Sequence, residues 1–157
     1  MLRPWESGRE SAWLETFRVR TPFAPWYSEI DSYGHVSNVH YCRYFEMGRM
    51  HYFSEVGDPE PVEKQFPFAH VVAEQRIRFM ERCFYDEKLT IVTKIAEFGR
   101  SSATLEQAIV DEHGTMRAVA VTVIVRNNGE ESKAWTAAQR EAVGKFEGFQ
   151  NSGTGEF

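Results

Sequence analysis

The chain has 157 residues, of which 42% are hydrophobic and 26% charged, and its formal net charge at pH 7 is −5. This length and balance predict one globular domain with a sizeable core. The negative charge gives no global attraction to nucleic acid or to an anionic membrane surface, so we expect neither as a partner. The longest apolar run, residues 118–125, is too short to span a bilayer.

The N-terminal residues are interrupted by charges and lack the apolar segment of a signal peptide. The two cysteines, Cys42 and Cys83, do not have the spacing of a CxxC motif, and we expect both to be reduced. Both observations favour a cytoplasmic protein.

The first 12 residues are polar and predict a flexible lead-in from which Trp5 docks on the domain. Residues 13–20 alternate partly between apolar and polar side chains, which predicts the first strand. Pro22 and Pro25 follow, so we expect this strand to be broken or bulged there.

The sequence Asp31-Ser-Tyr-Gly34 predicts a turn, because an Asp side chain accepts hydrogen bonds from nearby backbone N–H groups and Gly permits a positive φ. Asn38 is then the predicted N-cap of a helix that runs to about residue 55, where Gly57-Asp-Pro59 ends it. Apolar and aromatic side chains occupy more than one face of this helix. Such a pattern is typical of a central helix, so we expect a sheet to wrap around it.

Alternating and β-branched patterns predict four further strands at residues 70–80, 88–98, 102–110 and 115–126. The capping box Thr136-x-x-Gln139 predicts a last helix that ends near residue 149, and the polar residues 150–157 predict a disordered tail. One strand, a central helix, four antiparallel strands and a terminal helix indicate an α+β fold, with a single domain over residues 13–149.

The segment WYSEIDSYGHVSNVHYCRYFE, residues 26–46, resembles the first-strand-to-helix region of hotdog-fold acyl-CoA thioesterases. The branch that it is similar to is the 4-hydroxybenzoyl-CoA thioesterase family, whose pattern runs roughly aromatic-x-D-x-D-x-x-G-H-V-x-N before a helix bearing Tyr, Phe, Glu and Arg. The first acidic position is Glu29 here instead of Asp. The residues that match the rest of the pattern are Asp31, Gly34, His35 and Asn38.

The element order also matches the hotdog fold, in which one curled antiparallel sheet wraps round a long central helix. The resemblance implies hydrolysis of an acyl thioester, usually acyl-CoA, with no cofactor beyond the coenzyme A of the substrate. It further implies a homodimer or homotetramer with active sites between subunits, so that the Asp of one chain faces strands of its neighbour.

Asp31 is the residue that this chemistry points to, because thioester cleavage needs a base that activates water or a carboxylate that attacks the carbonyl. Backbone N–H groups near residues 37–39, at the helix start, would bind the oxyanion together with the helix dipole. A thiolate is a good leaving group, so no strong general acid is required. An Asp in a D-x-x-G turn can also be a turn former alone, and the resemblance favours catalysis.

Three neighbouring residues have alternative roles. His35 would polarise the carbonyl, orient water or hold Asp31, or it would bridge the turn structurally. Asn38 is predicted with Asp31 and His35 to belong to the catalytic group, and it would act through geometry, as an N-cap that fixes the oxyanion-binding turn, rather than as a reacting group. Glu46 lies in mid-helix, where Arg49 at i+3 predicts a structural ion pair, although other hotdog branches use a helix Glu in catalysis.

Arg100, with Ser101 and Ser102, is the candidate for contacting the phosphates or the pantetheine arm of coenzyme A, and an ordinary solvated hairpin turn is the competing interpretation. The histidines do not have metal-ligand spacing, so we predict no metal site. The residues expected to contact substrate are Gly34, Val39, Tyr41, Glu46, Arg100, Ser101 and Ser102.

Two other functions are compatible with this fold. A hotdog hydratase or dehydratase would use a His with a downstream helix Glu, and His35 and Glu46 could fill those roles. The sequence has no H-x-x-x-x-P-G string, which argues against this alternative. A non-catalytic acyl-binding protein is the second alternative, and the intact Asp31 argues against it. The aromatic side chains suit an aryl or a fatty acyl group equally well.

Overall fold

The computed structural model describes residues 3–6 and 8–149. Residues 150–157, predicted to form a disordered tail, lie outside the described residues. The elements in chain order are the 3-10 turn η1 (Pro4–Glu6), α1 (Glu10–Glu15), β1 (Val19–Phe23), the 3-10 turns η2 (Tyr27–Glu29) and η3 (Asn38–His40), α2 (Tyr41–Val56), β2 (His70–Phe79), β3 (Leu89–Phe98), β4 (Ser102–Asp111), β5 (Met116–Arg126) and α3 (Ala137–Glu147).

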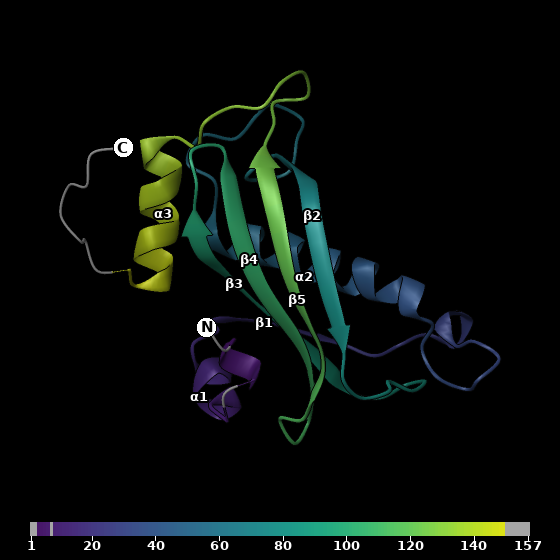
Figure 1. Cartoon of the computed structure of the whole chain (residues 1–157). Helices are drawn as coiled ribbons and strands as arrows, with labels where there is room; N and C mark the ends of the chain where they lie inside the picture. Colours follow the sequence, from purple (N-terminus) through teal and green to yellow (C-terminus); the bar gives the residue numbers. More distant parts are fainter. Residues whose placement is uncertain (1–2, 7, 150–157) are drawn as a thin grey trace.

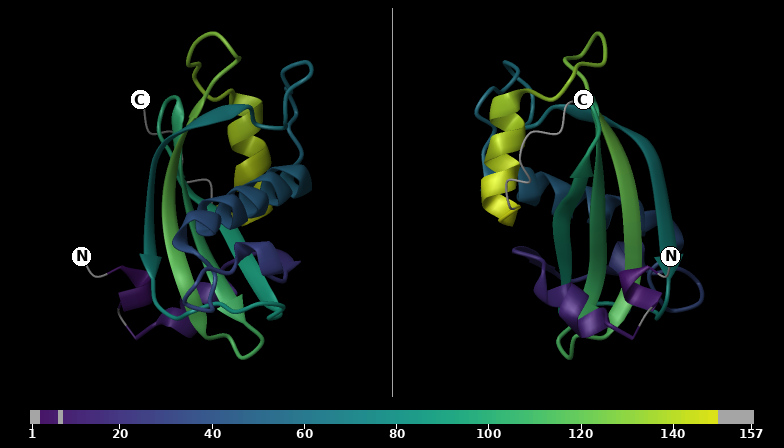
Figure 2. Two further views of the ribbon diagram at one scale, coloured as in Figure 1. Left: turned by 90° about the vertical axis from the view of Figure 1, so that its right-hand side faces the viewer. Right: turned by 60° about the vertical axis from the view of Figure 1, so that its left-hand side comes forward.

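The five strands form one antiparallel sheet in the order β1-β3-β4-β5-β2. Helix α2 crosses one face of this sheet, and it lies behind the strands in Figure 1. The sheet curls around that helix, as the side view in Figure 2 shows. The predicted α+β architecture, a curled antiparallel sheet round a long central helix, is therefore confirmed.

Alternation along the strands gives the sheet two buried faces, because successive side chains point to opposite sides. On the α2 side, Ile91, Ile109 and Ala118 pack with Tyr44 and Phe45 of the helix. The opposite side carries a separate cluster. Its members are Val92, Ala108, Val110 and Val119 of the sheet, with Trp5, Trp13 and Phe17 of the N-terminal segment.

The N-terminal segment differs from the prediction, because residues 10–15 form helix α1 and β1 begins only at Val19. Trp13 and Phe17 are four residues apart, a spacing that suits a helical repeat as well as a strand. Their rings pack edge to face, 4.8 Å apart. The docking of Trp5 is confirmed, since its side chain is only 5% exposed.

The other elements agree with the predicted ranges to within a few residues. The predicted break or bulge at Pro22 is wrong: β1 pairs with β3 in a continuous register from Val19 through Pro22 to Phe23, because β1 is an edge strand that tolerates a missing N–H donor. The capping box of α3 is present, with the Gln139 backbone N–H donating to Thr136 Oγ1 at 3.1 Å and the Thr136 N–H donating to Gln139 Oε1 at 3.2 Å.

Gly48 marks a close approach between α2 and the sheet. A Cβ atom at this position would lie 2.6 Å from Ile91 Cγ2 and 2.8 Å from Thr93 Oγ1. One turn earlier in the helix, the Phe45 carbonyl accepts a hydrogen bond of 2.8 Å from the buried Gln107 Nε2. The helix therefore lies as near the strands as a residue without a side chain permits.

Gly48→Ala is expected to lower the free energy of unfolding by about 1–3 kcal/mol, since the added methyl group overpacks this contact. Urea denaturation measures the effect. The matched control is Gly144→Ala in α3, where an added Cβ meets nothing within 4 Å. That change is expected to raise the free energy of unfolding by roughly 0.5–1 kcal/mol through helix propensity. Equal effects of the two substitutions would contradict a tight contact at Gly48.

Candidate active site

The Asp31 turn lies between η2 and η3, immediately before the central helix. The Gly34 N–H donates to the Asp31 carbonyl at 3.0 Å, and the Asp31 N–H donates to the His35 carbonyl at 3.0 Å. Asp31 Oδ1 accepts a hydrogen bond of 2.9 Å from the Tyr33 N–H. Gly34 has a φ of 84°. The predicted turn, with Asp bonding to the backbone and Gly at positive φ, is therefore present.

The helix begins differently from the prediction. Asn38 is the first residue of η3, Ser37 occupies the N-cap position without a side-chain cap bond, and α2 starts at Tyr41. The prediction that Asn38 is the N-cap is wrong because pairing with residues 29 and 30 keeps Val36 and Ser37 extended. Val36 bridges Ile30, and Ser37 donates its N–H to the Glu29 carbonyl at 3.0 Å.

Two backbone donors are free at this helix start. Ser37 and His40 use their N–H groups within the chain, with the His40 N–H bonded to the Ser37 carbonyl at 3.1 Å. Among the described residues, the N–H groups of Asn38 and Val39 have no acceptor. They are the orphan donors of a helix start, and Val39 is 65% exposed. Such donors can bind an oxyanion.

A surface cavity of about 360 Å³ is formed beside the turn. Asp31, His35, Asn38 and Tyr41 line one side of it, and residues 79–82 at the end of β2 line the other. Asp31 is partly buried. The structure thus brings the three predicted catalytic residues together on one cavity, with Tyr41 beside them.

His35 is placed by the turn rather than by Asp31. Its ring stacks on Tyr33 with centroids 6.2 Å apart, and its Nδ1 lies 3.4 Å from the Val36 carbonyl. In the described part of the chain, the His35 ring forms no hydrogen bond with the Asp31 carboxylate. The ring therefore borders the cavity without holding the carboxylate.

Tyr41 forms an apolar wall of this cavity. Its side chain is 4% exposed, and its ring meets the Phe79 ring edge to face at 4.9 Å. Burial, followed by a hydrogen bond with the Cys83 side chain, raises the pKa of Tyr41 well above its ordinary value. The hydroxyl is therefore neutral at physiological pH.

The predicted ion pair between Glu46 and Arg49 is wrong: within the described chain, no carboxylate lies within 4 Å of the Arg49 guanidinium. Arg49 is 4% exposed, whereas Glu46 is exposed and lines a different cavity of about 760 Å³ with Tyr44 and Met50. The exposed Glu46 carboxylate therefore acts on the buried Arg49 guanidinium only from beyond ion-pair distance. Arg49 Nε and Nη1 are buried without a hydrogen-bond partner, and burial lowers the pKa of this residue.

Arg100, Ser101 and Ser102 lie in or beside the β3–β4 turn, at the opposite end of the sheet from the Asp31 turn (Figure 1). The Asp31 turn is bonded to the chain just before β3, through the Val36 N–H and the Cys83 carbonyl at 2.8 Å. The ten residues of β3 span about 30 Å. A single chain therefore does not bring the candidate phosphate-binding turn to Asp31.

Residues 79–82 are the part of the site that the sequence reasoning missed. Phe79 and Met80 are adjacent large apolar residues at the end of β2, and they are 51% and 40% exposed. Two such neighbours break the alternation expected of a strand with one buried face. That break was the available signal that this strand end lines a site.

Residues 3–6 and 8–149 can be searched for metal-binding clusters and for membrane-spanning helices. These residues contain no group of three or more His, Cys, Asp or Glu side chains placed to hold a metal ion. None of their helices is both long enough and apolar enough to cross a membrane.

A curled antiparallel sheet round a long central helix is the architecture of the hotdog fold. The family model of the thioesterase-like superfamily matches residues 25–143, and the chain belongs to this superfamily.

The chain is also similar in sequence or structure to several known proteins. The uncharacterized protein YsmA of Bacillus subtilis (strain 168) is 28% identical over 133 residues, which cover 83% of this chain and 88% of YsmA. A thioesterase of Thermus thermophilus, solved with coenzyme A and Zn, has a TM-score of 0.77 at 25% identity, over 87% of this chain and 98% of that chain. A mutant 4-hydroxybenzoyl CoA thioesterase complexed with 4-hydroxybenzoyl CoA has a TM-score of 0.69 at 22% identity, over 80% and 97%. The resemblance to hotdog thioesterases is thereby confirmed.

Gly34 offers a test of the turn, because nothing lies within 4 Å of an added Cβ there and only the positive φ opposes a side chain. Gly34→Val is expected to lower the free energy of unfolding by about 1–2 kcal/mol. Gly34→Asn is expected to cost less, since Asn tolerates the left-handed region. Thermal unfolding of both variants measures this difference, and equal losses would contradict a requirement for positive φ.

Proposed function

We propose that this protein hydrolyses an acyl-CoA thioester, with Asp31 as base or nucleophile and the N–H groups of Asn38 and Val39 as oxyanion donors. One observation carries the proposal: the partly buried residue Asp31 lies on a cavity that is also lined by the start of the helix that carries the free donors. Membership of the thioesterase-like superfamily supports it. Among the relatives, the Thermus thermophilus thioesterase binds coenzyme A.

The two oxygens of Asp31 differ in their surroundings. Oδ1 accepts the Tyr33 N–H, while Oδ2 has no donor among the described residues. Oδ2 is therefore the atom that takes a proton from water or attacks the thioester carbonyl. In either route the carbonyl oxygen becomes negatively charged and the coenzyme A thiolate leaves. The thiolate takes up a proton, from Asp31 when water attacks and from solvent when Oδ2 attacks. Attack by Oδ2 also leaves an anhydride between Asp31 and the acyl group, which a water molecule hydrolyses to release the acid and free Asp31. Neither route needs an additional cofactor.

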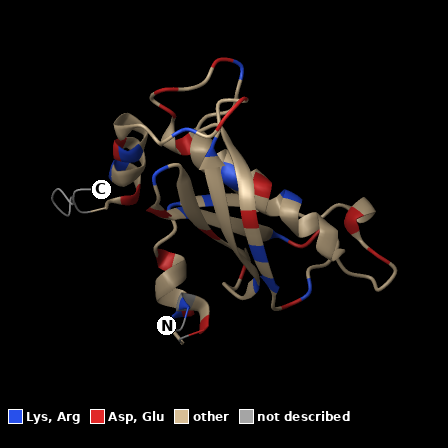
Figure 3. Cartoon of the chain, turned by 45° about the horizontal axis from the view of Figure 1, so that its top comes forward, with Lys and Arg blue, Asp and Glu red and all other residues tan. Residues whose placement is uncertain are grey.

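The active unit in this proposal is a homodimer that pairs the two β2 strands. Strand β2 is an edge strand of ten residues, and Val71, Val72 and Phe79 on it are 50%, 45% and 51% exposed. A long exposed edge of this kind is a template for pairing with another strand. Strand β2 also carries charged residues, Glu74 followed by Arg76 and Arg78, which Figure 3 colours red and blue.

Antiparallel pairing about a two-fold axis would place the His70 end of one β2 beside the Phe79 end of the other. The 99–102 turn lies near the His70 end, because Ser101 and His70 flank Arg126 of β5. The second copy would therefore bring its Arg100 turn toward the Asp31 cavity of the first. This arrangement accounts for the separation of the two groups within one chain.

Asp31→Asn is expected to lower the rate of thiol release from acyl-CoA by about 10²–10⁴-fold, because the variant loses its base or nucleophile. A panel of short, long and aryl acyl-CoA substrates with a thiol-reactive dye measures the rate. Glu15→Gln is the matched control, since Glu15 is an exposed carboxylate of α1, on the face of the sheet opposite α2. The control is expected to hydrolyse normally.

Other outcomes would identify a different catalytic carboxylate or a different function. Normal hydrolysis by the Asp31→Asn variant would remove Asp31 from the mechanism and leave Glu46 as the candidate carboxylate. Hydration of an enoyl-CoA without thiol release would identify a hydratase. Tight acyl-CoA binding with neither reaction would identify an acyl-binding protein.

Val72→Lys is expected to convert the dimer to monomer, because a charged side chain on an exposed strand edge opposes pairing. Sedimentation equilibrium measures the mass, and thiol release is expected to fall with dissociation. Phe149→Lys is the control, as Phe149 follows α3 and is 46% exposed. A monomeric wild-type protein, or a Val72→Lys dimer, would contradict pairing through β2.

A further inference from the structure

The loop between β2 and β3, residues 80–88, holds the Asp31 turn in place. The Val36 N–H at the end of the turn donates to the Cys83 carbonyl at 2.8 Å. On the other side of the turn, the Pro25 carbonyl accepts a hydrogen bond of 3.1 Å from the Asp86 N–H. The same loop supplies the far wall of the cavity at residues 80–82. The position of this loop therefore sets where Asp31 stands relative to a bound thioester.

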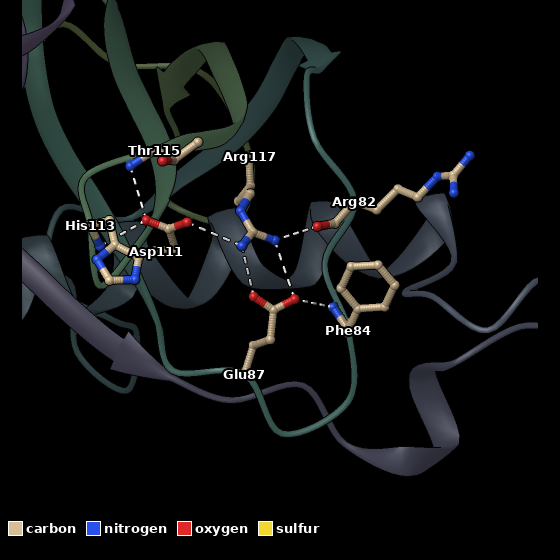
Figure 4. Close-up of polar contacts among 7 residues, drawn as sticks. All are labelled: Arg82, Phe84, Glu87, Asp111, His113, Thr115 and Arg117. Carbon is tan, nitrogen blue, oxygen red and sulfur yellow. Dashed lines mark hydrogen bonds and ion pairs between the residues drawn. The ribbon is translucent and has the colours of Figure 1, made fainter.

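The side chain of Arg117 in β5 forms hydrogen bonds with this loop, as Figure 4 shows. Its guanidinium donates to both carboxylate oxygens of Glu87, at 3.2 and 2.8 Å, and also to the carbonyl of Arg82. Glu87 in turn accepts the Phe84 N–H at 2.7 Å. One side chain thus binds the loop near its beginning and near its end.

The backbone of Arg117 also forms hydrogen bonds with this loop. Its carbonyl accepts the N–H groups of Met80 and Glu81, at 2.9 and 3.1 Å, where the loop leaves β2. These bonds continue the β2–β5 ladder for residues that no longer belong to β2. Substitution of the Arg117 side chain leaves this backbone part in place, so the two contributions are separable.

Asp111 anchors the guanidinium to the β4–β5 turn. Arg117 Nη2 donates to Asp111 Oδ2 at 3.1 Å, and Asp111 Oδ1 accepts the N–H groups of His113 and Thr115, both at 2.9 Å. Burial alone would raise the pKa of Asp111, but the two N–H donors and Arg117 outweigh it and lower that pKa. The carboxylate is therefore ionised at neutral pH, as its pairing with Arg117 requires.

The charged groups of this network are largely withdrawn from water. The side chains of Arg117, Glu87 and Asp111 are 14%, 24% and 13% exposed. In such surroundings a bidentate Arg–carboxylate contact holds Arg117 and Glu87 in one relative orientation. An exposed ion pair is weaker because solvent screens the charges.

We propose that Arg117 is a positioning residue for the candidate active site: through Glu87 and the Arg82 carbonyl it fixes loop 80–88, and the loop fixes the Asp31 turn. The kinetic consequence rests on the proposed thioesterase function, whereas the structural consequence does not. Loss of the guanidinium misplaces the carboxylate by a small distance, and catalysis is more sensitive than binding to such a shift.

Arg117→Met and Arg117→Lys test this role. The Met variant keeps most of the length and removes every donor, and the Lys variant keeps the charge without the two-pronged geometry. Hydrogen exchange at the Val36 amide is the first readout, and it is expected to speed up about tenfold or more in Arg117→Met, while amides in the centre of β3 and β4 stay protected. Arg117→Lys is expected to lie between this variant and the wild type.

Steady-state kinetics is the second readout. In Arg117→Met, kcat for thiol release is expected to fall about 10–100-fold while KM changes less than about threefold. Arg117→Lys is expected to recover part of kcat. If the Met variant fails to fold, Glu87→Gln takes its place, because it removes the charge of the carboxylate that Arg117 binds. Hydrogen exchange at the Val36 amide and kcat for thiol release are then measured for Glu87→Gln.

Tyr52→Phe is the matched control for stability. It removes a buried hydrogen bond of 2.5 Å to Glu147 of α3, away from loop 80–88. This variant is expected to melt at a lower temperature with unchanged kcat and no selective loss of Val36 protection. A merely structural Arg117 would give the same result as this control.

Three outcomes separate the claims. Unchanged Val36 exchange in Arg117→Met would overturn the positioning role, whether or not the protein is active. Faster Val36 exchange with normal kcat would show that the loop does not position the reacting groups. If no variant and no wild-type protein releases thiol from any acyl-CoA, the proposed function fails, and the exchange data alone decide whether Arg117 holds the Asp31 turn.

Discussion

The contact of α2 with the sheet at Gly48 is the constraint on which the rest of the structure depends. Because the helix has no side chain there, Ile91 and Thr93 of β3 pack directly against its backbone. The large aromatic residues on either side of this point, such as Phe45 and Phe53, are almost fully buried. The sheet therefore curves around a fixed axis, and the start of the helix projects beyond the strands, where the Asp31 turn joins it (Figure 1).

The parts of the fold that the sequence predicted well are those with local causes. Strand alternation, the Asp31–Gly34 turn chemistry and the capping box at Thr136 depend on residues a few positions apart. Helix α1 was mistaken for a strand because the spacing of Trp13 and Phe17 fits either period, and packing on the outer face of the sheet decided between them.

Only the part of the candidate site that comes from one short segment of the chain could be predicted from the sequence. Asp31, His35 and Asn38 belong to one short segment, so their proximity follows from the turn. The cap at Ser37 and the far wall of the cavity depend on bonds between distant segments, such as that of Val36 with Cys83. Likewise, an i+3 spacing indicates that Glu46 and Arg49 are neighbours, but tertiary packing buries only one of them.

The N-terminal segment determines how much of the outer face of the sheet is exposed. Trp5, Trp13 and Phe17 cover apolar residues on the face of the sheet opposite α2, and Lys94 lies 4.9 Å from the centre of the Phe17 ring. Trp13 Nε1 also donates to Glu106 at 2.8 Å, which secures this cover to β4. The chain thus covers this apolar part of the sheet with its own N-terminal side chains. Removing these first residues would expose an apolar face and invite aggregation.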